Sequence, residues 1–195
     1  MVLNEWDGKE NNFVEIAEDI KDIAYNPLRP EIMVTATKNS VYISYDGGMN
    51  WKSLGSMSTT TPGIKAVAVA DMPLYNSDGQ ENGTELAVFM SHPIFGLSYI
   101  LPEKEKPVWT DVTDGFVKLP SMSYPDEISD ILPVIRTQIS GKSEVELYLS
   151  QTFIPNVYKF DWANKKGILI YNEKEPSRTI ESLDFAGNNL IMVKT

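Results

Sequence analysis

The stretch that decides the fold is Ser44-Tyr45-Asp46-Gly47-Gly48-Met49-Asn50-Trp51, which directly follows the apolar run Val41-Tyr42-Ile43. A short Asp side chain accepts hydrogen bonds from the N–H groups of a turn, and glycine adopts backbone angles that other residues avoid. A large apolar residue such as Trp51 anchors the strand that leaves the turn. The spacing Ser-x-Asp-x-Gly-x-x-Trp therefore predicts a β-hairpin turn, with structural roles for Ser44, Asp46, Gly48 and Trp51.

This run resembles the Asp-box, or BNR, repeat of sialidase-like and sortilin-like β-propellers. In that family the box is a structural feature of the outer hairpin of a blade, away from the central site. The resemblance therefore implies a β-propeller fold and a turn-fastening role for Asp46. It is clearest between about residues 20 and 54, and worn versions of the box follow at 96–99 and 158–167.

Four segments of the chain open alike, with apolar residues at their first and fourth positions. They are 20–24, 64–68, 128–132 and 180–184. Starts at such intervals are typical of propeller blades. Short runs rich in β-branched and aromatic residues follow each start, separated by Gly, Pro, Asn and Asp, and such runs predict strands. In the unit that starts at 20, the predicted second, third and fourth strands are 31–37, 41–44 and 51–54. In the units that start at 64 and 128 they are 85–90, 95–100 and 108–112, and 146–149, 156–160 and 168–171. The unit that starts at 180 has only a second strand, 189–193.

The strand count predicts an all-β chain, a single segment spanning 1–195 and built of four-stranded antiparallel β-propeller blades. The three complete units, the half unit at the end and an orphan strand at 13–17 amount to about three and a half blades. A closed ring has roughly 4–8 blades, and an open arc leaves strand edges exposed. We therefore expect either a part of a larger propeller or self-association that closes the ring. A small antiparallel sandwich or barrel with similar strand spacing is the alternative fold.

Composition excludes several classes of partner. The net charge of −10 argues against nucleic acid, because phosphate binding requires clustered Lys and Arg. The chain has no cysteine, and so no disulfide, thiolate metal site or thiol nucleophile. Its first ten residues lack the basic and apolar regions of a signal peptide, and no apolar run approaches the roughly 18–20 residues of a membrane span. We expect no membrane insertion and no cofactor, and these features leave the compartment open.

Two carboxylates are the candidates for catalysis. Asp22 and Asp130 hold the same position in two repeats, near the start of the innermost strand, which in a propeller borders the central channel. Two carboxylates that face one cavity can serve as acid and base in an inverting glycoside hydrolase, and some BNR-like propellers hydrolyse β-glucans. Ala66 and Ser182 hold the equivalent position in the other units, so a polar residue that suits a wet channel is the alternative explanation.

Other chemistry is less well supported. The three arginines, Arg29, Arg136 and Arg178, match no sialidase arginine motif, and His92 is the sole histidine. The insert 71–85, the longest predicted loop, places Asn76, Asp78 and Glu85 at offsets similar to those of a calcium loop, although Leu74 stands at the first ligand position.

We therefore expect a non-catalytic β-propeller scaffold that binds a protein or a glycan through loops at one face. The aromatic residues Tyr45, Tyr75 and Tyr124 are the candidates for such contacts. A carbohydrate-active hydrolase is the competing function, and an assembly factor similar to other Asp-box propellers is the third. A fold alone does not name a ligand.

Overall fold

The structure is a computed structural model that describes residues 3–6, 13–16, 19–56, 63–92, 96–118, 127–137, 141–172, 179–186 and 189–194. These residues form sixteen strands and no helix, which confirms the all-β prediction. Every strand pairing is antiparallel and joins strands that are neighbours in the sequence. The sheets are separate, and among the described residues no strand pairs with a strand of another sheet.

Three of the sheets have four strands. Sheet I consists of β3 (Asp22–Tyr25), β4 (Met33–Ala36), β5 (Ser40–Ser44) and β6 (Lys52–Ser56). Sheet II consists of β7 (Val67–Tyr75), β8 (Glu81–His92), β9 (Gly96–Ile100) and β10 (Thr110–Val112). Sheet III consists of β11 (Ile128–Thr137), β12 (Ser143–Gln151), β13 (Asn156–Asp161) and β14 (Lys166–Asn172).

Two further sheets have two strands each. Sheet IV consists of β15 (Ile180–Ala186) and β16 (Asn189–Lys194), as the half unit at the end of the sequence predicts. The N-terminal hairpin consists of β1 (Leu3–Trp6) and β2 (Phe13–Ile16). The prediction of an orphan strand at 13–17 is therefore wrong, because β2 pairs along its whole length with β1.

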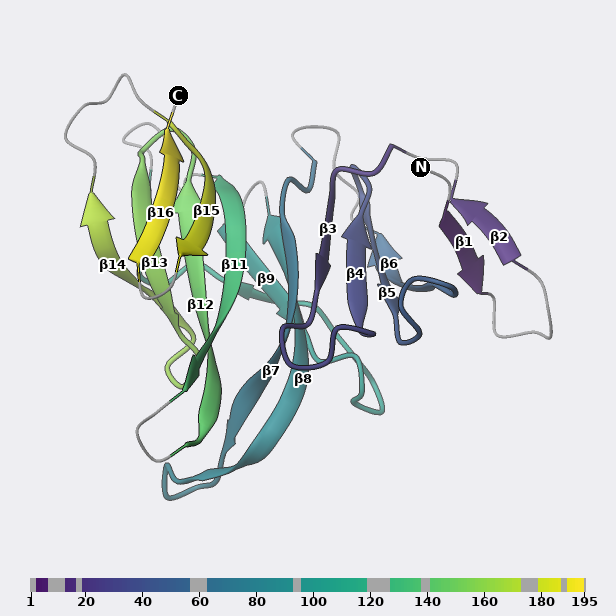
Figure 1. The fold of residues 1–195 in the computed structure, drawn as a ribbon, viewed down its shortest axis with the longest axis horizontal. Helices are drawn as coiled ribbons and strands as arrows, with labels where there is room; N and C mark the ends of the chain where they lie inside the picture. Colours follow the sequence, from purple (N-terminus) through teal and green to yellow (C-terminus); the bar gives the residue numbers. More distant parts are fainter. Residues whose placement is uncertain are drawn as a thin grey trace.

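Sheets I to IV stack face to face in chain order, and an apolar core lies between each pair. Val34 and Val69 belong to the core of sheets I and II, Phe89 and Leu147 to that of sheets II and III, and Tyr148 and Leu183 to that of sheets III and IV. The first strand of each sheet contacts the first strand of the next: β3 with β7, β7 with β11, and β11 with β15. In Figure 1 sheet III lies toward the left, sheet I toward the right, and the N-terminal hairpin at the far right.

The core between sheets II and III joins small residues to large rings. Ala68 and Ala70 on β7 are fully buried and leave room for the ring of Phe89, which meets Phe160 and Trp162 edge-on at centroid distances of 6.1 and 5.8 Å. Edge-to-face contacts at such distances add to the free energy of apolar burial. The rings therefore fix how these two sheets face each other.

Sheets II and III also approach closely where Gly115, just after β10, meets Gly167 in β14. Gly115 has a φ of +82°, and a Cβ atom there would lie 2.0 Å from the carbonyl oxygen of Gly167. The N–H of Gly167 donates to the carbonyl of Asp114 at 2.9 Å. Only glycine at 115 fits both the backbone angle and the space.

Residues 44–51 form the predicted turn between β5 and β6. Asp46 Oδ1 accepts the N–H of Asn50 at 2.9 Å, and Asp46 Oδ2 accepts from the Asn50 side-chain amide at 2.6 Å. The Ser44 hydroxyl donates to Asp46 Oδ1 at 2.8 Å and accepts the N–H of Gly48 at 2.9 Å. The buried Trp51 donates its ring N–H to the carbonyl of Gly48 at 2.9 Å. All four predicted residues thus take part in the turn.

The carboxylate of Asp46 is held in its charged form. Partial burial works to raise its pKa, but the hydrogen bonds from Asn50 and Ser44 outweigh burial and bring the pKa below its ordinary value. The turn of sheet III within residues 158–167 has a similar contact. Asp161 accepts from the Asn164 side chain at 2.8 Å and from its N–H at 3.1 Å. In sheet II the acid that accepts from a serine lies within a strand. Asp111, on β10, accepts from the Ser98 hydroxyl at 2.6 Å.

Asp46→Ala should lower the free energy of unfolding by about 1–3 kcal/mol. It removes the acceptor for the N–H of Asn50 and leaves the Ser44 hydroxyl and the Asn50 side chain without their hydrogen-bond partner. Urea unfolding followed by tryptophan fluorescence measures the change. Asp78→Ala, in the exposed turn between β7 and β8, is the matched control and should shift the unfolding midpoint much less. An Asp46→Ala protein as stable as the wild type would contradict the turn-fastening role.

Candidate functional site

The two candidate catalytic acids lie on equivalent strands and make equivalent bonds. Asp22, on β3, accepts the N–H of Ile23 with Oδ1 and the N–H of Val67, the first residue of β7, with Oδ2, both at 2.8 Å. Asp130, on β11, accepts the N–H of Ile131 at 2.8 Å and the N–H of Leu183, on β15, at 2.6 Å. Each carboxylate therefore ties the first strand of one sheet to the first strand of the next.

Both acids have a raised pKa. Burial is the main cause in each case, and the bonds from Val67 and Ile23, or from Leu183 and Ile131, counteract it only in part. The charge of Asp22 also contributes to the raised pKa of Asp130. A raised pKa suits a general acid, yet every oxygen of both carboxylates already accepts a backbone N–H. Neither acid lines the cleft between sheets II and III that is described below.

The insert 71–85 differs from the predicted loop. Asp71 to Tyr75 continue β7, and Glu81 begins β8, so that only a tight turn at 76–80 lies outside the ladder. The Asn76 side chain closes that turn by accepting the N–H groups of Asp78 at 3.0 Å and Gln80 at 2.8 Å. Glu85 lies along β8 opposite Met72 and pairs with Lys104 at 3.2 Å, so the structure does not bring the three predicted calcium ligands together.

The arginines are likewise dispersed. Arg29 forms an ion pair with Asp71, a buried acid on β7 that also accepts from the Asn26 side chain at 3.0 Å. This contact links the loop after β3 to sheet II, so Arg29 has a structural role. Arg136 contacts Glu146 on sheet III. Arg178 and Tyr124 lie outside the described residues, as does the side chain of His92.

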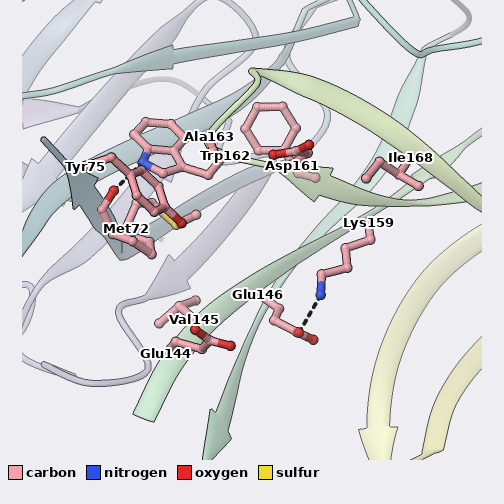
Figure 2. Close-up of a pocket in the computed structure, with 12 residues that line it drawn as sticks. Met72, Tyr75, Glu144, Val145, Glu146, Lys159, Asp161, Trp162, Ala163 and Ile168 are labelled. Carbon is pink, nitrogen blue, oxygen red and sulfur yellow. Dashed lines mark hydrogen bonds and ion pairs between the residues drawn. The ribbon is translucent and has the colours of Figure 1, made fainter. Parts of the chain in front are cut away.

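A cleft of about 290 Å³ opens between the ends of sheets II and III. Figure 2 shows its wall, with Met72 and Tyr75 from β7 on one side and residues of β12 and β13 on the other. Tyr75, one of the three predicted contact residues, is 41% exposed here. Tyr45 is as exposed but lies in the Asp-box turn of sheet I. The other lining residues are Pro73, Glu144, Val145, Glu146, Lys159, Phe160, Asp161, Trp162, Ala163 and Ile168.

Glu146 is the most heavily bonded side chain of the cleft. It accepts from Lys159 Nζ at 2.5 Å, from the Tyr148 hydroxyl at 2.6 Å and from Arg136 Nε at 3.3 Å. Burial works to raise its pKa, and the bonds from Lys159, Tyr148 and Arg136 outweigh burial and lower it. Glu146 is therefore ionised and neutralised within the protein, and Lys159 is engaged by the same bond.

The mouth of the cleft is acidic. The pKa of Tyr75 is raised first by burial and then by the charges of Glu81, Glu144 and Asp161, which act against the smaller effect of Lys142. The pKa of Asp161 is lowered, chiefly by the bond from Asn164 against the effect of burial, so this acid is ionised at neutral pH. Glu81 forms an ion pair with Lys142, so the charges left beside the exposed ring of Tyr75 are those of Glu144 and Asp161. Such an arrangement suits a cationic group.

Lys165 contacts Trp162, a residue that lines the cleft, and has an unusual pKa. It occupies the turn after β13 with a φ of +52°, and its ammonium group lies over the ring of Trp162. Burial lowers its pKa to about 7, although Glu85 and Asp161 act in the opposite direction. The charge on this side of the cleft therefore becomes more positive as the pH falls through about 7.

Sequence reasoning missed Glu144 and Glu146. The sequence pattern that could have indicated them is the alternation of acidic and apolar residues, since Glu144 and Glu146 alternate along β12 with the buried Val145 and Leu147. In a strand this period places the acids on one face and the apolar residues on the other. The meeting of these acids with β7 depends on how the two sheets stack, which the sequence does not reveal.

No protein-family model matches the chain, and no curated protein matches it. Within the described residues no helix is long and apolar enough to cross a membrane. Among the same residues no group of three or more His, Asp or Glu side chains is arranged to hold a metal ion.

Asp130→Ala should destabilise the protein by about 1–3 kcal/mol, because the N–H of the buried Leu183 loses its acceptor. The effect should depend on pH. With a raised pKa, the folded state binds the proton of Asp130 more tightly than the unfolded state, so the stability that this group contributes is greatest below its unfolded pKa. It then falls as the pH rises through the folded pKa.

The advantage of the wild type over Asp130→Ala should therefore shrink as the pH rises above about 3.9, the ordinary pKa of an Asp side chain, as measured by urea unfolding at a series of pH values. Asp78→Ala, an exposed acid in the turn between β7 and β8, is the control and should show little of this trend. A difference that grows with pH would contradict the raised pKa.

Proposed function

We propose that this chain is a non-catalytic β-propeller scaffold whose acidic cleft between sheets II and III binds a basic segment of a protein partner. The observation that carries the proposal is that Glu144 and Asp161 line the cleft together with the exposed ring of Tyr75. The negative charge of the chain as a whole has the same sign as the cleft and favours the same kind of partner.

The stacking of the sheets supports the propeller. Four meandering antiparallel sheets follow one another with a core between each pair, and their first strands contact one another in order. Such an arrangement is typical of blades around an axis. The turn of β5 and β6, with its Ser44, Asp46 and Trp51 contacts, agrees with the Asp-box resemblance.

The bonding of the acids supports a scaffold over an enzyme. Asp22 and Asp130 accept backbone N–H groups across sheets, and Glu146 is held by two cations and a phenol. A carboxylate that already serves as an acceptor in the fold is poorly placed to exchange a proton with a substrate. The polar groups of the cleft mouth, in contrast, surround an exposed aromatic ring, as binding surfaces often do.

A labelled hexalysine peptide, read by fluorescence anisotropy, tests the cleft. Wild-type protein should bind it, and Glu144→Gln should weaken binding by about threefold to tenfold, because one charge at the cleft mouth is removed. Glu105→Gln, which removes the same charge from an exposed loop, is the matched control and should change binding little. Shifts in the backbone NMR signals of Tyr75 and Ile168 would locate the peptide.

Two results would overturn the basic-peptide proposal. Equal weakening by Glu144→Gln and Glu105→Gln would mean that the peptide responds only to net charge. Binding of a neutral β-glucan oligosaccharide in the cleft, with no binding of hexalysine, would indicate a glycan-binding module instead.

The raised pKa of both Asp22 and Asp130 favours a glycoside hydrolase as the second candidate function. The test is the release of reducing ends from β-glucan oligosaccharides by wild-type protein and by the folded double variant Asp22→Ala, Asp130→Ala. We expect the wild type to release no more than the double variant. Activity that the wild type has and the folded double variant lacks would establish the hydrolase and overturn the scaffold.

A further inference from the structure

Lys165 is a half-buried lysine that forms no ion pair with any other described residue. Its ammonium group lies instead over the ring of Trp162, and it is 5.3 Å from the ring centroid of Tyr99. The cations that do form ion pairs with acids are Arg29, Lys65, Lys104, Arg136, Lys142 and Lys159. Lys165 therefore meets an aromatic surface where these residues meet a carboxylate.

The aromatic surface beneath Lys165 is fixed by the core of the protein. Trp162 directly follows β13 in sheet III, and Tyr99 lies on β9 in sheet II. The two rings meet edge-on at a centroid distance of 5.0 Å, and the buried Trp162 donates its ring N–H to the carbonyl of Pro73 at 2.8 Å. The amine of Lys165 thus lies where sheets II and III meet, on rings that are held in place.

The backbone of Lys165 is in a conformation that lysine rarely adopts. With a φ of +52°, Lys165 is the one non-glycine residue of positive φ in the described part of the chain. The turn itself is fastened by Asp161 and Asn164, and a glycine after them would adopt this angle at lower cost. A side chain retained at a strained position indicates a role for that side chain.

The amine is available as a nucleophile at neutral pH. Burial lowers the pKa of Lys165 to about 7, against the opposite effects of Glu85 on β8 and Asp161 at the end of β13. About half of the amine is therefore neutral at pH 7, whereas the neutral fraction of an ordinary lysine is roughly a thousandfold smaller. The neutral form carries the lone pair that attacks a carbonyl carbon.

The surroundings of the amine suit a cation that is less strongly hydrated than an ammonium. The ring of Trp162 and the charges of Glu85 and Asp161 favour positive charge. Burial acts against the ammonium, because its three N–H donors lose water. A protonated imine keeps the positive charge, spreads it over nitrogen and carbon, and has a single N–H donor. The site therefore stabilises a protonated imine better than it stabilises the ammonium.

We propose that Lys165 is a covalent binding site for small aldehydes, which it holds as a protonated imine over the ring of Trp162. The neutral amine attacks the carbonyl carbon, a C–N bond forms, and the carbonyl oxygen becomes a hydroxyl group as the proton leaves the nitrogen. Loss of this hydroxyl group as water leaves a C=N bond. One amine and one aldehyde thus give one imine and one water, and a proton from the solvent makes the imine cationic.

The rings that contact Lys165 each line a cleft. Trp162 lines the cleft of about 290 Å³ between sheets II and III, and Tyr99 lines a second cleft of about 200 Å³. These clefts leave space beside the rings for a substituent of a few carbon atoms. The reaction at Lys165 does not require the first cleft to bind a basic peptide.

Propionaldehyde is the probe, and Lys166, an exposed lysine at the next position, is the control within the same chain. The protein is equilibrated with the aldehyde at pH 7 and quenched with borohydride, which reduces the imine to a stable amine. Peptide mapping by mass spectrometry then gives the occupancy of each lysine and separates both from the α-amino group. We expect at least about tenfold higher occupancy at Lys165 than at Lys166, and loss of that signal in Lys165→Arg. Equal occupancy would overturn the proposal.

Trace acetylation with acetic anhydride at a series of pH values measures the neutral amine separately. The rate at Lys165 should level off above about pH 7, whereas the rate at Lys166 should continue to rise with pH. Parallel profiles for the two lysines would overturn the proposal. Rapid acetylation of Lys165 without retention of the aldehyde would also overturn it, because the amine would then be reactive but the imine would not be stabilised.

Glu85→Gln tests whether the reactive amine lies where the structure places it. The charge of Glu85 raises the pKa of Lys165, so its removal should move the midpoint of the acetylation profile to lower pH. Glu105→Gln removes the same charge from an exposed loop and is the matched control, which should leave the midpoint unchanged. The same midpoint in both variants would overturn the assignment of the site.

Discussion

The structure depends on how the first strands of neighbouring sheets are tied together. A first strand has a ladder partner on one side only, so its other N–H groups need acceptors that the sheet does not provide. Asp22 and Asp130 supply them, each with one oxygen for its own strand and one for the next sheet. The cost is that two carboxylates are partly buried, which their raised pKa reflects. The stacking of the apolar faces follows from the alignment that these bonds impose.

Much of this architecture could be predicted from the sequence, because the signals are local. The Asp-box residues act within one turn, and the strands of sheets I to III lie where apolar runs alternate with Gly, Pro, Asn and Asp. The short strand β1 escaped notice, since its four residues, LNEW, lack a regular alternation. The roles of Asp22 and Asp130 also escaped, because their partners are 45 and 53 residues away. The sequence placed both acids correctly but could not say that they bond to backbone.

The cleft illustrates the same limit. Its acids come from β12 and β13 and its aromatic ring from β7, and no motif links these segments. Glu146, which the sequence leaves unremarked, is held by Lys159, Tyr148 and Arg136, so its charge is balanced within the protein. The charges that remain for a ligand are those of Glu144 and Asp161 beside Tyr75, since Glu81 pairs with Lys142. A list of the acidic residues alone would not separate these two groups.

The contact between Gly115 and Gly167 influences the shape of the cleft, although neither glycine lines it. Backbone meets backbone there, and a Cβ atom at Gly115 would collide with the carbonyl of Gly167. Gly167 directly precedes Ile168, which lines the cleft. Any side chain at either glycine would act as a wedge between sheets II and III and widen the angle at which they meet. Two residues that do not line the cleft thus influence its dimensions, and a lineage could alter the ligand size by changing a position outside the cleft.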